Sequence, residues 1–127
     1  WLLASTGENI TVTFAEDLPL KFSMPPKGFI KSVLNLLMLA AECAHGSGDI
    51  EVVALEGSHG VEIKVSGQKV KFRDGTESAL KGEIAVEDLD ARTAHPYFSG
   101  KLISHFGLRL SAKADEKSGI VAFILEF

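Results

Sequence analysis

The chain contains only one cysteine, one tryptophan and one tyrosine among its 127 residues. Cys43 cannot form a disulfide within the chain, and no signal peptide is evident, so we expect a protein of the reducing cytoplasm. The sequence also lacks a stripe of basic residues, and its net charge is -4. Binding to nucleic acid therefore has little electrostatic support.

A long uninterrupted hydrophobic run is missing as well. The most apolar stretch lies within residues 29–44, and four polar side chains interrupt it: Lys31, Ser32, Asn35 and Glu42. This stretch is too short and too polar to span a membrane. The composition, 46% hydrophobic and 24% charged, is typical of a globular protein, and the length predicts one domain. Because the chain begins at Trp1 rather than methionine, we expect an N-terminal part to precede it.

Hydrophobic periodicity predicts a mixture of strands and helices. Strands are expected at 9–14, 50–55, 61–65, 108–114 and 120–127, and helices at 29–44 and 94–105. The middle of the chain is less regular, with a short strand expected at 70–72 and a helical turn at 78–80. This order predicts an α/β (α+β) two-layer sandwich, with helices on one face of a mixed, mostly antiparallel sheet.

The first helix has an unusual distribution of apolar residues. At about 100° per residue, one core stripe is expected from Ile30, Val33, Leu34, Leu37, Ala41 and Ala44. Leu39 points almost directly away from this stripe. Such a residue predicts either a pocket filled by its side chain or an apolar surface for a partner, formed by Phe29, Leu36, Leu39 and Cys43. The filled pocket is the preferred interpretation, and the two can coexist.

The same helix carries a resemblance to a known motif. Residues 33–41 read V-L-N-L-L-M-L-A-A, which is similar to the N-box helix of histidine-kinase ATP-binding domains, typically L-L-N-L-L-x-N-A. Asn35 matches the first asparagine of that motif. Leu39 replaces the second, which binds Mg²⁺ in the kinases. The order of elements also resembles the histidine-kinase ATP-binding (Bergerat) fold.

Two further nucleotide-binding motifs of that fold are degenerate. Where the kinases have D-x-G-x-G, with an aspartate that binds the adenine amino group, this chain has Gly67, Lys69 and Lys71 at the three defining positions. Where they have a G-x-G-L-G loop that binds phosphate through backbone N–H groups, residues 93–100 hold one glycine and a proline. The resemblance therefore implies an ATP-binding fold that no longer binds ATP, with no cofactor and no metal.

One family fits this description, the ChpT-type histidine phosphotransferases of bacterial phosphorelays. The similarity lies in the proline-led helix of residues 26–42 and in the segment L-D-A-R-T-A-H-P-Y at 89–97. In this family a helical hairpin forms the dimer and carries the phosphorylated histidine, and a degenerate kinase-like domain follows it. The resemblance implies that residues 1–127 are that second domain, with the hairpin missing from this chain.

The residues suggest no catalytic group. The phosphoacceptor histidine of the family precedes an acidic residue, and none of the four histidines here does. Cys43 lacks a basic neighbour that would activate it, so a half-buried inert thiol is expected. The acidic cluster at residues 83–90 has no histidine or cysteine at metal-ligand spacing. The chain alone is therefore expected to be catalytically silent.

The expected function is that of a phosphotransferase domain that positions receiver domains without binding ATP. Its implied partners are a hybrid histidine kinase and the receivers of response regulators, within a homodimer. An alternative is an active kinase or ATPase of the same fold, with an ATP site built from Asn35, Lys69 and Lys71. A third possibility is a pure protein-interaction module.

Overall fold

The computed structural model describes residues 9–15, 26–55, 59–115 and 117–127. Five strands form one sheet in the order β1-β2-β3-β5-β4. They span Asn9–Phe14 (β1), Ser47–Ala54 (β2), Gly60–Ser66 (β3), Arg109–Asp115 (β4) and Ile120–Glu126 (β5). β1 runs parallel to β2, and the other neighbouring strands are antiparallel. The mixed, mostly antiparallel sheet predicted from the sequence is confirmed.

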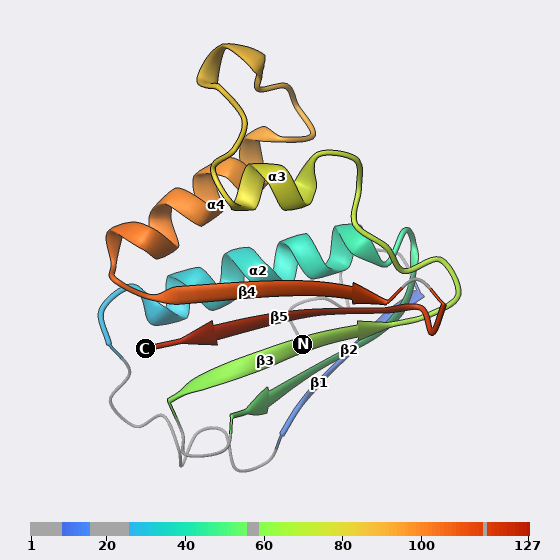
Figure 1. Cartoon of the computed structure of the whole chain (residues 1–127). Helices are drawn as coiled ribbons and strands as arrows, with labels where there is room; N and C mark the ends of the chain where they lie inside the picture. Colours follow the sequence, from blue (N-terminus) through green and yellow to red (C-terminus); the bar gives the residue numbers. More distant parts are fainter. Residues whose placement is uncertain (1–8, 16–25, 56–58, 116) are drawn as a thin grey trace.

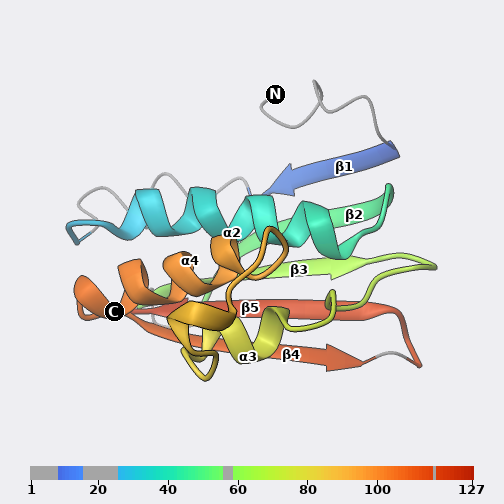
Figure 2. The same cartoon turned by 90° about the horizontal axis from the view of Figure 1, so that it is seen from above.

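The helices lie together on one face of this sheet (Figure 1). Helix α2 spans Phe29–Cys43 and helix α4 spans Ala94–His105. The short helix α3, Thr76–Leu80, packs against α4, and a 3-10 turn, η2, follows it at Val86–Asp88. Seen from above, α2 and α4 lie side by side over the sheet (Figure 2). The arrangement is the two-layer sandwich that the sequence predicted.

The core lies between the two layers. Alternate residues of β5 face it, so Val121, Phe123 and Leu125 are fully buried. Ile50 of β2 and Ile63 of β3 are buried in the same way. Removing each such side chain from water contributes about 1.5–3 kcal/mol to folding. One face of the sheet is thus continuously apolar, and the helices pack on it.

Helix α2 is rotated relative to the orientation expected from its sequence. Ile30 is 56% exposed and Leu34 is 41% exposed, although both were expected in the core stripe. Residues expected on the other side are buried instead, and they are Phe29, Leu36, Leu39 and Cys43, at 0–2% exposure. The predicted core stripe is therefore wrong for Ile30 and Leu34, although Leu37 and Ala44 are buried as expected and Val33 and Ala41 pack against the core. The predicted partner surface is not a surface of this domain. Its four side chains belong to the hydrophobic core.

Ser32 explains part of the error. It is fully buried, and its hydroxyl donates a hydrogen bond to the carbonyl of Gly28 at 2.8 Å. This local bond satisfies the hydroxyl, so a serine that looks polar in sequence can face the core. A helix whose apolar residues surround most of its circumference then gives no clear direction for the buried face.

Helices α3 and α4 approach each other closely at Gly100. A Cβ atom at this position would overlap the backbone carbonyl of Leu80. On the same helix Tyr97 and Ile103 are buried, whereas Phe98 is 60% exposed. The strand expected at 70–72 is also wrong, since this segment lies outside the sheet.

Candidate functional site

Asn35 uses both ends of its side-chain amide within the protein. Its Nδ2 donates to the carbonyl of Lys31 at 3.0 Å, and its Oδ1 lies 3.1 Å from Nε2 of His95 on α4. A carbonyl can only accept, so the Lys31 contact fixes the orientation of the amide. The oxygen therefore faces His95, and Nε2 of His95 carries the proton that is shared with it. The asparagine that matches the N-box is engaged in helix packing.

Leu39 lies in the interior, at 1% exposure. Asn35 and Glu42 flank it along α2, and both approach His95, whose Nδ1 is 4.0 Å from Oε2 of Glu42. The first turn of α4 thus crosses α2 beside Leu39. An apolar side chain also offers no oxygen to Mg²⁺, which binds oxygen ligands almost exclusively. This position contributes packing, as the filled-pocket interpretation requires.

Gly67 lies in a crowded place at the end of β3. Its N–H donates to the carbonyl of Gly119 at 3.1 Å, in the turn between β4 and β5. A Cβ at Gly67 would lie 3.2 Å from both Cα of Gly48 and the carbonyl of Ser47. Contacts this short leave little room for the aspartate side chain that the kinases have at this position.

The two lysines that replace glycines follow this turn, and both are exposed. The backbone N–H of Lys71 donates to the carbonyl of Cys43 at 3.1 Å, which ties this segment to the end of α2. Nε2 of His45 lies 3.2 Å from the carbonyl of Lys71. The structure therefore brings Lys71 to the end of α2, whereas Asn35 and Leu39 face α4 and the core.

The loop before α4 is closed by its own carboxylate. Oδ1 of Asp90 accepts hydrogen bonds from the N–H of Arg92 at 2.9 Å and from the N–H and hydroxyl of Thr93, each at 3.1 Å. The bonds from Arg92 and then from Thr93 hold the pKa of Asp90 below its usual value. The backbone N–H groups that precede α4 thus donate to the carboxylate of Asp90 and are not free to bind a phosphate. Sequence reasoning missed this role, although an aspartate before a helix is a signal for a turn in which its side chain accepts backbone N–H groups two and three residues further on.

Cys43 is buried at 1% exposure. Burial raises the pKa of its thiol to about 12, the nearby Glu42 acts in the same direction, and Arg73 opposes them. A thiol with such a pKa carries almost no thiolate at neutral pH. The expected inert thiol is supported, and its burial is more complete than expected.

The histidines occupy structural positions. His95 contacts α2 as described, His59 packs edge-on against Phe127, and His105 does so against Phe106.

Within the residues that the structure describes, no group of three or more histidine, cysteine or acidic side chains could hold a metal ion. No helix in the described ranges is long and apolar enough to cross a membrane.

Comparison with solved structures identifies the class of fold, which is that of histidine-kinase ATP-binding domains. The mycobacterial sensor histidine kinase MprB is 12% identical with a TM-score of 0.53, and the match covers 92% of this chain and 78% of that one. The catalytic domain of histidine kinase ThkA is 19% identical with a TM-score of 0.54, covering 94% and 78%. A bacterial phosphotransferase is 21% identical with a TM-score of 0.71, covering 93% of this chain and 55% of that one.

The family follows from the sequence itself. A family model described as the histidine phosphotransferase C-terminal domain matches residues 4–118, nearly the whole chain. The chain belongs to this family. It spans about half the length of the phosphotransferase of known structure. A comparison with curated proteins gave no significant match.

Proposed function

We propose that this chain is the C-terminal, kinase-like domain of a dimeric cytoplasmic histidine phosphotransferase that relays phosphate between receiver domains. In this proposal the phosphoacceptor histidine lies in an N-terminal helical hairpin outside the chain, and the hairpin forms the homodimer. Phosphate arrives from the receiver of a hybrid histidine kinase and leaves to the receiver of a response regulator. Membership of the phosphotransferase family and the half-length match support this division.

The contact between Asn35 and His95 supports the absence of ATP most directly. In the resemblance to kinases, Asn35 belongs to the nucleotide site, yet here both ends of its amide are bonded within the protein. The neighbouring motif position, Leu39, is buried and has no metal ligand to offer. A nucleotide would have to displace a packed helix contact in order to reach these positions.

The chemistry proposed for the whole protein does not need ATP. The phosphoryl group of a receiver aspartate passes to a histidine nitrogen and then to the aspartate of a second receiver. Each step is an in-line transfer, whose rate depends mainly on alignment and on neutralisation of charge by the Mg²⁺ of the receiver. The domain described here contributes alignment by holding the receiver against the hairpin, and it is silent without the hairpin.

The test uses the full-length protein that contains this chain. A receiver carrying ³²P-labelled aspartyl phosphate is mixed with the full-length protein, and label is followed to the hairpin histidine and to a second receiver. We expect transfer by the full-length protein, with a lower KM for the receiver than the hairpin alone shows. Equal KM values would contradict a positioning role for this domain.

A second measurement addresses the alternatives. Calorimetric titration compares Mg²⁺-ATP with Mg²⁺-GTP up to millimolar concentration, and we expect no preference for the adenine nucleotide. A preference for ATP of tenfold or more, or labelling of the protein by γ-³²P-ATP, would favour an active kinase or ATPase of the same fold. Absence of any label from phosphorylated receivers would favour a pure interaction module.

A further inference from the structure

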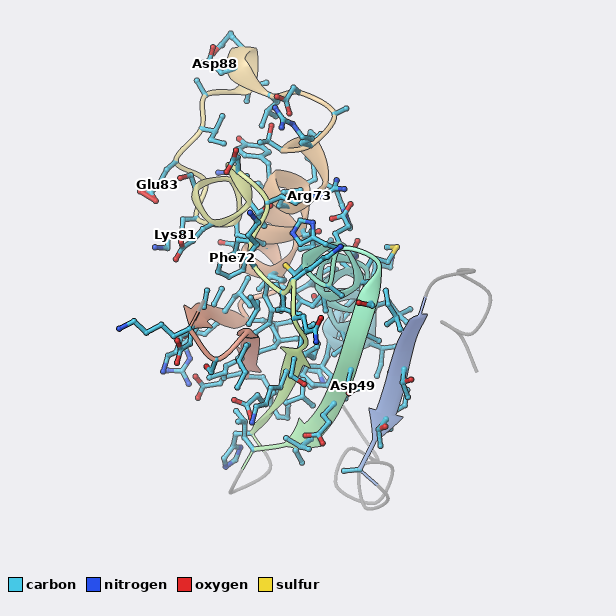
Figure 3. All side chains as sticks on the ribbon, turned by 90° about the vertical axis from the view of Figure 1, so that its right-hand side faces the viewer. Asp49, Phe72, Arg73, Lys81, Glu83 and Asp88 are labelled. Carbon is cyan, nitrogen blue, oxygen red and sulfur yellow. The ribbon has the colours of Figure 1, made fainter. Side chains whose placement is uncertain are left out.

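Basic side chains from three separate segments surround one hollow on the surface. It has a volume of about 330 Å³, and its lining residues are His45, Lys71, Phe72, Arg73, Asp74 and Arg92. His45 follows the end of α2, residues 71–74 connect the sheet to α3, and Arg92 precedes α4. Figure 3 looks onto this end of the molecule and labels Phe72 and Arg73 in the connecting segment. We call this feature the basic hollow.

The backbone around the basic hollow is well anchored. Val70 is buried, and the ring of Phe72 packs edge-on against Phe123 of β5, with the ring centroids 5.8 Å apart. This alternation leaves Lys71 and Arg73 on the exposed side. The N–H of Lys71 is held by the carbonyl of Cys43, and its carbonyl is contacted by His45. The two cations therefore rise from a segment fixed at several points.

Arg92 approaches from the opposite side on an equally fixed loop. The carboxylate of Asp90 accepts hydrogen bonds from the N–H groups of Arg92 and Thr93; it keeps its negative charge, which attracts Arg92. The end of α2 carries partial negative charge, but the N–H of Lys71 satisfies its last carbonyl, that of Cys43. Three cations, Lys71, Arg73 and Arg92, thus face the two carboxylates of Asp74 and Asp90, and one positive charge remains in excess.

Among the residues that the structure describes, no carboxylate lies at ion-pair distance from the cations of the basic hollow. Within the described ranges, Lys71, Arg73 and Arg92 form no ion pair. Asp74 is the one carboxylate in the lining, against three permanent cations. A second hollow of about 430 Å³ shares His45 and Lys71 with the first and adds Lys69. Such a concentration of charge is unexpected in a chain whose net charge is -4, and its self-repulsion would be relieved by a bound anion.

We propose that the basic hollow binds a small phosphate-bearing anion, with Lys71, Arg73 and Arg92 as the residues that contact its oxygens. Arginine and lysine are the side chains suited to phosphate, and arginine adds paired N–H donors. A concave site of this size fits a diphosphate group better than the flat surface of a protein. The proposed site recognises the charge of a phosphate group, so it goes beyond the proposed phosphotransfer function and does not depend on it.

The test is titration of the full chain with inorganic pyrophosphate at low ionic strength, followed by calorimetry and by backbone amide NMR. We expect saturable binding, with shifts at residues 45, 71–74 and 92. The double variant Arg73→Gln/Arg92→Gln should weaken binding at least tenfold. The variant Asp74→Asn should strengthen it several-fold, and Lys64→Gln, an exposed lysine on β3, should leave it unchanged.

Comparison of ligands separates the possible sources of the phosphate group. Pyrophosphate, ADP and GDP are expected to bind within a few-fold of one another if the phosphates alone are recognised. A preference for ADP over GDP of tenfold or more would overturn this phosphate-only site and also the ATP-free part of the proposed function. Absent binding, or equal weakening by Lys64→Gln, would overturn the inference alone. So would an effect of the double variant on receiver affinity without any pyrophosphate binding, which would mark the hollow as a protein interface.

Discussion

Oδ1 of Asn35 and Nε2 of His95 lie 3.1 Å apart and join helices α2 and α4 across 60 positions of the sequence. The two side chains come from segments that correspond to the N-box and to the loop before the last helix of a histidine kinase. In the kinases, according to the resemblance, these segments face a nucleotide. Here they bond to each other, which supports the proposal that this domain does not bind ATP.

This contact can be measured as a coupling energy. We expect the variants Asn35→Ala and His95→Ala to destabilise the domain, and the double variant to cost less than their sum. The coupling should be about 1 kcal/mol, the usual net value of a side-chain hydrogen bond. Urea unfolding of the four proteins measures it. Additive effects within error would show that the two side chains do not interact in solution.

The orientation of α2 is tested by a matched pair of leucines. Leu36 is fully buried, so Leu36→Ala should lower the free energy of unfolding by about 2–5 kcal/mol. Leu34 is 41% exposed, so Leu34→Ala should lower it by less than about 1 kcal/mol. Both variants remove the same atoms from the same helix. The reverse order would restore the core stripe expected from the sequence.

Restoring the missing motif residue should damage the fold rather than recover a nucleotide site. Leu39→Asn places an amide in a site that is 1% exposed, with an expected loss of about 3 kcal/mol of stability. Leu39→Met is the control, because it conserves volume and should cost less than about 1.5 kcal/mol. Thermal unfolding with and without Mg²⁺-ATP provides both readouts. Stabilisation by ATP that is larger for Leu39→Asn than for Leu39→Met would show that a nucleotide pocket persists.

A substitution at Gly100 tests whether α3 packs closely on α4, because the direction of the change in stability depends on this packing. In a helix interior, Gly→Ala normally stabilises by about 1 kcal/mol. Here the new methyl group would overlap the carbonyl of Leu80, so we expect Gly100→Ala to destabilise the domain by about 1–3 kcal/mol. Ser104→Ala, on an exposed part of α4, should have little effect. A stabilised Gly100→Ala variant would mean that α3 does not pack closely on α4.

Because Cys43 is buried, we expect the free energy of unfolding to fall at alkaline pH. Burial raises the pKa of its thiol from 9.0 to about 12, so between these values the unfolded chain has released the proton while the folded chain still holds it. Because the folded state then binds more protons, stability falls as pH rises, by about 1.4 kcal/mol per pH unit at most. The variant Cys43→Ala should lose this contribution to the pH dependence of stability. The contributions of the other titrating groups should remain. The difference between the two denaturation profiles over pH 9–12 measures it.

Much of the architecture could be predicted from local patterns. The alternation in residues 9–14 and the short apolar run in residues 120–126 predict strands directly, and the bounds of α4 agree with those expected. The loss of the nucleotide motifs is visible in the sequence because those motifs are defined by residue identity at fixed positions. Leu39, Gly67, Lys69 and Lys71 needed no structure to be recognised as substitutions.

The buried face of α2 was not predictable in the same way. Apolar residues surround most of this helix, and Ser32 hides its hydroxyl in a local bond to Gly28. Two elements cover it, the sheet below and α4 beside it, so its buried arc is wider than one stripe and is displaced from the one expected. Phe98 shows the converse, since this apolar residue of α4 stays 60% exposed and its ring contacts that of Tyr97 edge-on.

The sequence by itself therefore determined the order of elements, the family and the absence of the residues that bind Mg²⁺ and adenine, because these depend on neighbouring residues and on identity. Only the tertiary structure decided which side of α2 is buried, that Asn35 bonds to His95, and that Lys71, Arg73 and Arg92 meet at one hollow. These relationships join residues up to 60 positions apart. They depend on how the helices pack on the sheet, and local periodicity carries no information about that packing.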